Sequence, residues 1–255
     1  MRMPHTHLQF DIHIGRQKPE NVTNREAACP FCSPDELEGV LERRGPMIWL
    51  RNKYPVLKDA FQTVLIETDD CDAELSVYPR EHLHALFSFG VEKWREMERS
   101  GSFRSVLFFK NHGPYSGGSM RHPHMQIVGL ETYDYLQHVK PSDFEGIVID
   151  REAGVECNLS TLPRAGFFEC NVVLSDMDRL PRMADYVQIL AHWILNRFNR
   201  RCQSYNLFFY RWEERIVVKV VPRFVTSPLY VGYAIPQVPN NLEEVVREIQ
   251  RIYFL

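Results

Sequence analysis

The segment His122-Pro123-His124-Met125-Gln126 carries side chains at a spacing that suits chemistry at a phosphorus atom. Alternate residues of a β-strand point to one face, so a strand beginning near Arg121 would place His122, His124 and Gln126 together. An imidazole is mostly neutral near pH 7 and can act as a nucleophile without a separate base. A His-x-His pair by itself is equally typical of a surface strand or a metal site.

The residues before this segment, from Asn111 to Ser119, are rich in glycine and small polar side chains. Glycine lets the backbone approach a ligand closely, and successive backbone N–H groups in such a loop form a concave anion site. A loop of this kind directly before the paired histidines favours catalysis at phosphorus over an inert surface strand.

Cys29 and Cys32 form a Cys-x-x-Cys pair in a polar N-terminal region. This spacing is typical of a metal site, which needs two further ligands to close a tetrahedron. The available nitrogen donors are His82, His84 and His122. One alternative is that both cysteines are small buried apolar residues. A redox dithiol is disfavoured, because no helix pattern begins at Cys29 to lower its pKa.

The composition is that of an ordinary globular chain: 255 residues, 44% hydrophobic and 25% charged, with a net charge of −3. This charge gives no general attraction to nucleic acid. No apolar run is long enough to predict a membrane span, and no apolar leader begins the chain. Six cysteines are too sparse for a disulfide scaffold, so the expected compartment is the cytoplasm.

The apolar pattern predicts an α+β chain with two similar halves. The first half has expected strands at 47–50, 61–67, 74–78, 105–110 and 125–130, and a helix at 83–97. The second has expected strands at 167–174, 205–210 and 215–221, and helices at 183–198 and 242–253. The order strand–helix–strand–strand occurs twice, roughly 110 residues apart, which predicts an internal duplication with domains at 1–140 and 141–255.

Four elements occur in a fixed order: Cys-Pro-Phe-Cys, Asn52 before Tyr54-Pro55, the stretch from Phe109 to Gly113, and Ser-Gly-Gly-Ser-x-x-His-Pro-His-x-Gln. This series resembles the galactose-1-phosphate uridylyltransferase branch of the histidine-triad (HIT-like) superfamily, which includes ADP-sugar phosphorylases. The resemblance covers residues 10–130 well and the later residues weakly.

The resemblance implies a duplicated HIT-like α+β unit, with antiparallel sheets and helices packed on one face, and a homodimer. It makes His124 the nucleophile and Gln126 the amide that holds the transferred phosphoryl group. The expected nucleotide-binding residues are Asn52, Asn111, Gly117, Gly118, Ser119 and Arg16. The expected structural zinc ligands are Cys29, Cys32, His82 and His122, with His82 preferred over His84.

The implied activity is transfer of a nucleotidyl group between a nucleotide sugar (a UDP- or ADP-sugar) and a sugar 1-phosphate, through a nucleotidyl-histidine. Hydrolytic members of the superfamily generally have a third histidine where this chain has Gln126. Glutamine cannot donate a proton as an acid, so transfer is favoured over hydrolysis. The alternatives are an ADP-sugar phosphorylase, a nucleotide hydrolase, or a non-catalytic nucleotide-binding relative. The strand in the second half that matches the histidine segment, 216–221, has no histidine.

Overall fold

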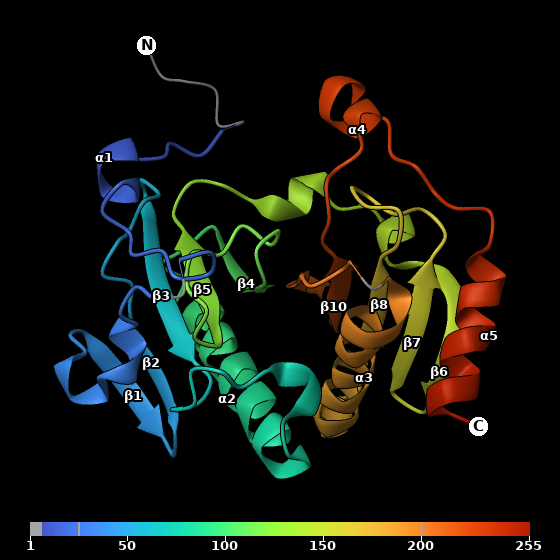
Figure 1. The fold of residues 1–255 in the computed structure, drawn as a ribbon, viewed down its shortest axis with the longest axis horizontal. Coiled ribbons are helices and arrows are strands. Elements are labelled where there is room, and N and C mark those ends of the chain that lie inside the picture. Colours follow the sequence, from blue (N-terminus) through green and yellow to red (C-terminus); the bar gives the residue numbers. More distant parts are fainter. Residues whose placement is uncertain (1–6, 25, 200) are drawn as a thin grey trace. The chain divides into compact units, whose positions relative to one another are not determined.

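The computed structural model describes residues 7–24, 26–199 and 201–255. The chain forms two compact units, each built around five antiparallel strands (Figure 1). The first unit comprises residues 1–74, 88–110 and 118–138, and the second comprises residues 75–87, 111–117 and 139–255. Residues 75–87 and 111–117 therefore group with the second unit, although they precede the boundary expected near residue 140.

In the first half of the chain the strands are β1 (Val40–Arg44), β2 (Met47–Arg51), β3 (Ala60–Ile66), β4 (Ser105–His112) and β5 (His124–Leu130), and the helices are α1 (Ile12–Gly15) and α2 (Arg80–Arg99). In the second half the strands are β6 (Gly146–Glu152), β7 (Val155–Ser160), β8 (Cys170–Leu174), β9 (Tyr205–Trp212) and β10 (Arg215–Pro222), and the helices are α3 (Leu180–Trp193), α4 (Pro228–Tyr233) and α5 (Leu242–Tyr253).

The two units repeat one strand order. The strands lie in the order β1-β2-β3-β5-β4 in the first unit and β6-β7-β8-β10-β9 in the second. A long helix connects the third and fourth strands of each set: α2 lies between β3 and β4 in sequence, and α3 between β8 and β9. The α+β class and the internal duplication predicted from the sequence are confirmed. β10 in the second unit corresponds to β5 in the first.

Each sheet has a helix packed against it. In the first unit α2 approaches so closely that a Cβ added at Gly90 would lie 2.6 Å from the Phe108 ring. The indole of Trp94 donates a hydrogen bond to the Val106 carbonyl at 2.9 Å. In the second unit α3 contacts β7, β8 and β10 and fully buries Tyr186, while α5 lies along β6 (Figure 1). Within the described residues, no helix combines the length and apolar character that crossing a bilayer requires.

Some expected elements differ from the observed ones. The segment expected as a strand at 74–78 is wrong: it contains a 3₁₀ turn, Leu75–Val77, and the Tyr78 amide donates to the Leu75 carbonyl. Strands β1, β6 and β7 were not anticipated. The strand expected from residue 167 begins at Cys170. The helix expected at 183–198 ends its regular α-helical part at Trp193 and continues as a π-helical turn, Ile194–Phe198.

Candidate active site and metal centre

His124 and Gln126 lie on β5, a central strand of the first sheet. His124 pairs with Ile66 of β3, and Gln126 lies between Val64 of β3 and Phe109 of β4. Because residues two apart on a strand share a face, His124 and Gln126 point to the same side of the sheet. The strand begins at His124, so His122 precedes it rather than continuing the same row. His122 and His124 are thereby separated into two environments.

The orientation of the His124 ring is set by its own backbone neighbourhood. Nδ1 lies 2.8 Å from the His122 carbonyl oxygen. A carbonyl can only accept, so Nδ1 carries the proton and Nε2 keeps its lone pair. Burial and the nearby ammonium charge of Lys110 lower the pKa of His124 to about 4, against the opposing effect of that hydrogen bond. The ring is therefore neutral at physiological pH and its nucleophilic atom is Nε2.

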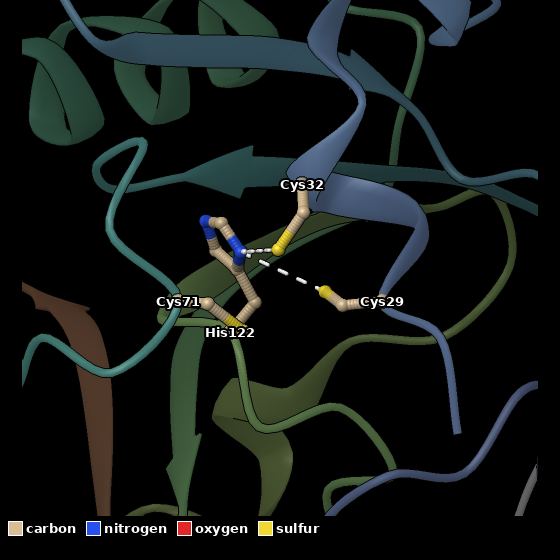
Figure 2. A group of neighbouring side chains, drawn as sticks. All are labelled: Cys29, Cys32, Cys71 and His122. Atoms are coloured by element: carbon tan, nitrogen blue, oxygen red, sulfur yellow. Dashed lines mark hydrogen bonds between the residues drawn. The ribbon is translucent and has the colours of Figure 1, made fainter. Parts of the chain in front are cut away.

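His122 faces a group of cysteines. The ligand atoms of Cys29, Cys32, Cys71 and His122 all lie within 4.8 Å of one another. Figure 2 shows the four side chains gathered at one place. His122 Nδ1 lies 3.7 Å from the Cys29 sulfur and 3.6 Å from the Cys32 sulfur. Nε2 of His122 is 2.7 Å from the Thr68 carbonyl and must donate to it, which leaves Nδ1 as the free donor atom for a metal.

The charges of this cluster suit a bound cation. Burial raises the pKa of the Cys29 thiol, but hydrogen bonds from His122 and the Phe31 backbone, together with the hydrogen bond to Cys32 and the charge of His122, outweigh burial and lower the pKa to about 6. Burial and the neighbouring thiols of Cys71 and Cys29 raise the pKa of Cys32 to about 12. Three thiolates this close repel one another, so they can all ionise only when a cation lies between them. The cluster has the donor set and spacing to hold a metal ion.

The cluster of side chains that could bind a metal differs from the expected ligand set at a single position. Cys29, Cys32 and His122 are in the cluster, but His82 is not, and Cys71 occupies the fourth place. His82 lies on α2 in the second unit, edge-on to the Tyr78 ring at a centroid distance of 4.9 Å. Cys71 comes from the turn after β3, in Asp69-Asp70-Cys71-Asp72. The only signal in the sequence was that Cys71 is the third cysteine of the first half and has no second cysteine close to it in the chain.

Phe31, inside the Cys-Pro-Phe-Cys turn, contacts both the cysteine–histidine cluster and His124. Its ring meets His122 edge-on at 5.8 Å and His124 at 5.6 Å between centroids. A 3₁₀ turn, Pro30–Cys32, presents this ring while placing the two flanking cysteines toward His122. The turn that supplies two cluster sulfurs therefore also packs against the imidazole of His124.

Two lysines supply positive charge near His124, and both were missed by sequence reasoning. Lys110 is 2% exposed and forms a 2.5 Å ion pair with the fully buried Glu67. Lys18 is half-buried, which lowers its pKa, and its charge also disfavours protonation of His124. Arg16, expected to reach a phosphate, is exposed and follows the short helix α1. Lys18, two residues later in the chain, lowers the pKa of His124 together with Lys110.

The other expected nucleotide-binding residues of the first unit lie in loops. Asn52 follows β2, and its side-chain oxygen accepts from the Tyr54 amide at 2.9 Å. Gly118 and Ser119 lie in the loop before β5. Asn21, which sequence reasoning missed, holds this loop: its amide donates to the Ser119 carbonyl at 2.9 Å, and its side-chain oxygen accepts from the Arg121 amide at 2.6 Å. Among the described residues, Asn21 Nδ2 is buried without a hydrogen-bond partner.

Asn111 and Gly117 belong to the second unit. The Asn111 side-chain oxygen accepts from Asn206 Nδ2 at 2.7 Å. Gly113 in the same loop adopts φ +82°, and a Cβ there would lie 2.1 Å from the Gln203 carbonyl, so no side chain fits. This loop is thus fixed against β9 and the residues before it.

Family models match almost the whole chain. The model of the N-terminal domain of the family DUF4931, a domain of unknown function, matches residues 10–133, and that of its C-terminal domain matches residues 136–254. The crystal structure of a DUF4931 family protein from Bacillus cereus is 44% identical, with a TM-score of 0.78, over 85% of this chain and all of that one.

More distant similarity extends to named enzymes. An ADP-glucose phosphorylase from Arabidopsis thaliana, solved with ADP-glucose, shares the fold with a TM-score of 0.70 at 15% identity, over 94% of this chain and 92% of its own. A galactose-1-phosphate uridylyltransferase from Thermotoga maritima is 24% identical over 125 residues, which are 43% of this chain. The matched region spans about two fifths of the length of the curated relatives.

Proposed function

Because the chain belongs to the DUF4931 family and has the galactose-1-phosphate uridylyltransferase-like fold, we propose that it is a nucleotidyltransferase. Its proposed substrates are a nucleotide sugar, with uracil or adenine as the base, and a sugar 1-phosphate. The reaction passes through a nucleotidyl group bound covalently to His124.

One observation carries this proposal: the hydrogen bond from His124 Nδ1 to the His122 carbonyl. It fixes the ring and leaves the Nε2 lone pair on the side of the sheet shared with Gln126. Lys110 and Lys18 place positive charge near the ring, where a phosphate would be attracted. A histidine buried only for packing would not need two cations beside it, because these charges disfavour its protonated form without adding to its packing.

The proposed reaction has two balanced steps. Nε2 attacks the α-phosphorus, a P–N bond forms, and the P–O bond to the sugar phosphate breaks with its electron pair on the departing oxygen. The acceptor phosphate then attacks the same phosphorus and His124 leaves as neutral imidazole. The Gln126 amide holds a non-bridging oxygen, and loss of one such donor typically costs about 3 kcal/mol in the barrier. Neither step needs a proton from residue 126, because both leaving groups depart with little need for one.

We further propose that the cysteine–histidine cluster holds zinc. With zinc–sulfur bonds of about 2.3 Å and zinc–nitrogen bonds of about 2.0 Å, the nitrogen–sulfur edge of a tetrahedron is about 3.5 Å. The two sulfurs measured from His122 Nδ1 lie at 3.7 and 3.6 Å. Four protein ligands leave no open position, so zinc would be structural and would fix the Phe31 turn and the His122 carbonyl that orients His124.

The remaining assignments concern binding. Asn52, Gly118 and Ser119 are proposed to contact the nucleotide, together with Asn111 and Gly117. The unpartnered Nδ2 of Asn21 and the ammonium of Lys18 are added to this set in preference to the exposed Arg16. A homodimer is proposed from the family resemblance.

Intact-mass spectrometry tests the proposal directly. The chain is incubated with UDP-glucose, ADP-glucose or a diadenosine polyphosphate, without an acceptor, and its mass is measured before and after denaturation. The expected result is an increase by one nucleotidyl group that is absent from His124→Asn and present in the matched control His138→Asn, an exposed histidine.

The adduct mass also identifies the base. Release of the adduct by hexose 1-phosphate supports the transferase, and release by inorganic phosphate alone supports a phosphorylase. Release by water alone supports a hydrolase. If none of the donors forms an adduct, the covalent mechanism is refuted and a nucleotide-binding protein without turnover is favoured.

A further inference from the structure

The second unit contains a hollow of about 340 Å³ that the proposed nucleotidyl transfer does not use. It lies between the loop that precedes β8, the ends of β9 and β10, and the segment that follows β10. Every residue around it belongs to the second unit. Its volume is at the lower end of the range of small-molecule sites in proteins.

Aromatic rings form much of the wall. Phe167 and Phe224 lie nearly parallel, 7° apart in plane, with centroids 5.8 Å apart. Phe208 and Tyr210 contribute from β9. All four side chains are partly exposed rather than sealed in the core. Rings that remain partly hydrated around a concavity are a ready surface for a flat apolar ligand.

The base of the hollow is charged although it is buried. Lys219 and Glu169 are 1% and 2% exposed and form an ion pair at 2.8 Å. The other oxygen of Glu169 accepts the amides of residues 164, 165 and 166, so this carboxylate is fully engaged. Within the described part of the chain, Glu169 is the one hydrogen-bond partner of Lys219 Nζ. An ammonium has three N–H donors, so two remain for a ligand.

A second cation is held in place at the wall. Arg223 Nη1 donates to the side-chain oxygen of Asn206 at 2.7 Å. Asn206 is itself buried and donates to the Ser116 carbonyl at 3.1 Å as well as to Asn111. A guanidinium fixed before a ligand arrives loses less conformational entropy on binding. In total, the lining has three cationic side chains, from Arg164, Lys219 and Arg223, and one carboxylate.

We propose that this hollow is a second small-molecule site, separate from His124, for a planar aromatic compound that carries an anionic group. The ring lies among Phe167, Phe208 and Phe224, and the anion accepts hydrogen bonds from Lys219 and Arg223. The anionic group is a phosphate, as in a nucleoside monophosphate, or a carboxylate. Both groups are anions that accept charge-assisted hydrogen bonds from lysine and arginine.

Gly166 provides a clean way to close the site. It lines the hollow, and a Cβ added to it meets its nearest neighbours at 3.5 and 3.8 Å, which are ordinary contacts. Gly166→Leu therefore fills the hollow, while Gly166→Ala adds only the Cβ and serves as the matched control. The double variant Lys219→Met/Glu169→Gln removes the charges without leaving one of them buried and unpaired.

Isothermal titration calorimetry on the full chain, in the His124→Asn background, measures binding of AMP, UMP and indole-3-acetate, with adenosine as the uncharged comparison. We expect at least one anionic probe to bind more tightly than adenosine, with an affinity that falls as salt concentration rises. Gly166→Leu should weaken this binding at least tenfold, and Gly166→Ala should leave it within about twofold.

The anionic probes distinguish the two possible anionic groups. Binding of a nucleotide assigns phosphate as the anion, and binding of indole-3-acetate assigns carboxylate. If Gly166→Leu is folded, as judged by its melting temperature, and binds as tightly as Gly166→Ala, the proposal is overturned. If Gly166→Leu does not fold, the Lys219→Met/Glu169→Gln variant is used instead, and unchanged binding in that variant also overturns the proposal. The proposal also fails if no anionic probe binds better than adenosine.

Discussion

Replacing Cys71 tests the ligand set that distinguishes the structure from the sequence-based expectation. A tetrahedral structural zinc site contributes roughly 10–16 kcal/mol in small domains, so one ligand of four contributes about 3 kcal/mol on average. At about 1.4 kcal/mol for each tenfold change, Cys71→Ser should lower zinc affinity by about two orders of magnitude. The serine hydroxyl keeps the volume but does not ionise at neutral pH, so it cannot replace the thiolate.

The assay is competition for zinc against a chromogenic chelator, with the metal content of the purified protein measured in parallel. His82→Asn is the control, because His82 lies outside the cluster and should keep the affinity of the unaltered chain. If Cys71→Ser binds zinc as tightly as the unaltered chain while His82→Asn loses affinity, the cluster described here is not the metal site. If neither change has an effect, the four-ligand assignment fails altogether.

Three further predictions concern reactivity and stability. Gln126→His should allow the leaving group to be protonated and should therefore increase hydrolysis of the nucleotide sugar when no acceptor is present, measured as sugar phosphate formed. No increase would contradict the role given to the Gln126 amide. Glu67→Gln should destabilise the chain by about 3–5 kcal/mol in urea unfolding, because the buried ammonium of Lys110 loses the carboxylate charge that balances it, whereas Glu243→Gln in an exposed pair should cost under about 1 kcal/mol. Burial raises the pKa of Glu169, but its lysine partner and backbone donors outweigh burial and hold the pKa below the ordinary 4.5. The unfolded chain therefore binds this proton first, so stability is present above about pH 4.5 and is lost as pH falls through the folded pKa. The urea midpoint should drop over that range, and a profile of equal slope in Glu169→Gln would argue against this origin.

The elements with a clear apolar period were predictable, and the edges of the sheets were not. The long helices and the central strands bury one face or both, so their apolar spacing marks them in sequence. β1 and β6 are edge strands, each paired on one side alone, and charged residues such as Glu42 and Arg151 interrupt their pattern. Edge strands avoid aggregation by carrying such charges, which removes the signal that identifies them. The segment at 74–78 alternates like a strand but has no partner strand, and its backbone closes a local turn.

The candidate nucleophile was recognisable because its neighbours in sequence are also its neighbours in space. His124, Gln126 and the preceding small-residue loop are within a single stretch, and a strand's two-residue period already places the two side chains on one face. The hydrogen bond that selects the tautomer of His124 is also local, from one residue to the carbonyl two positions earlier.

The metal cluster shows the limit of the same reasoning. The Cys29–Cys32 spacing indicated a metal, and His122 was among the available donors, but the fourth ligand is 39 residues from Cys32 and follows a different strand. Nothing in the chain between them marks Cys71 as a partner rather than His82. Only the pairing of β3 with β5 brings the turn after β3, with Cys71, close to His122.

The sequence by itself determined that His124 and Gln126 lie on a strand behind a small-residue loop, and that two cysteines are spaced for a metal. The family resemblance had already given these histidines separate roles, and the tertiary structure supplied the geometry: His122 faces three sulfurs, and the His122 carbonyl accepts a hydrogen bond from His124 Nδ1. It also placed the positive charges of Lys110 and Lys18 near His124 and formed the hollow in the second unit. These features depend on contacts between residues far apart in the chain, whose free energies are set by burial and geometry rather than by local spacing.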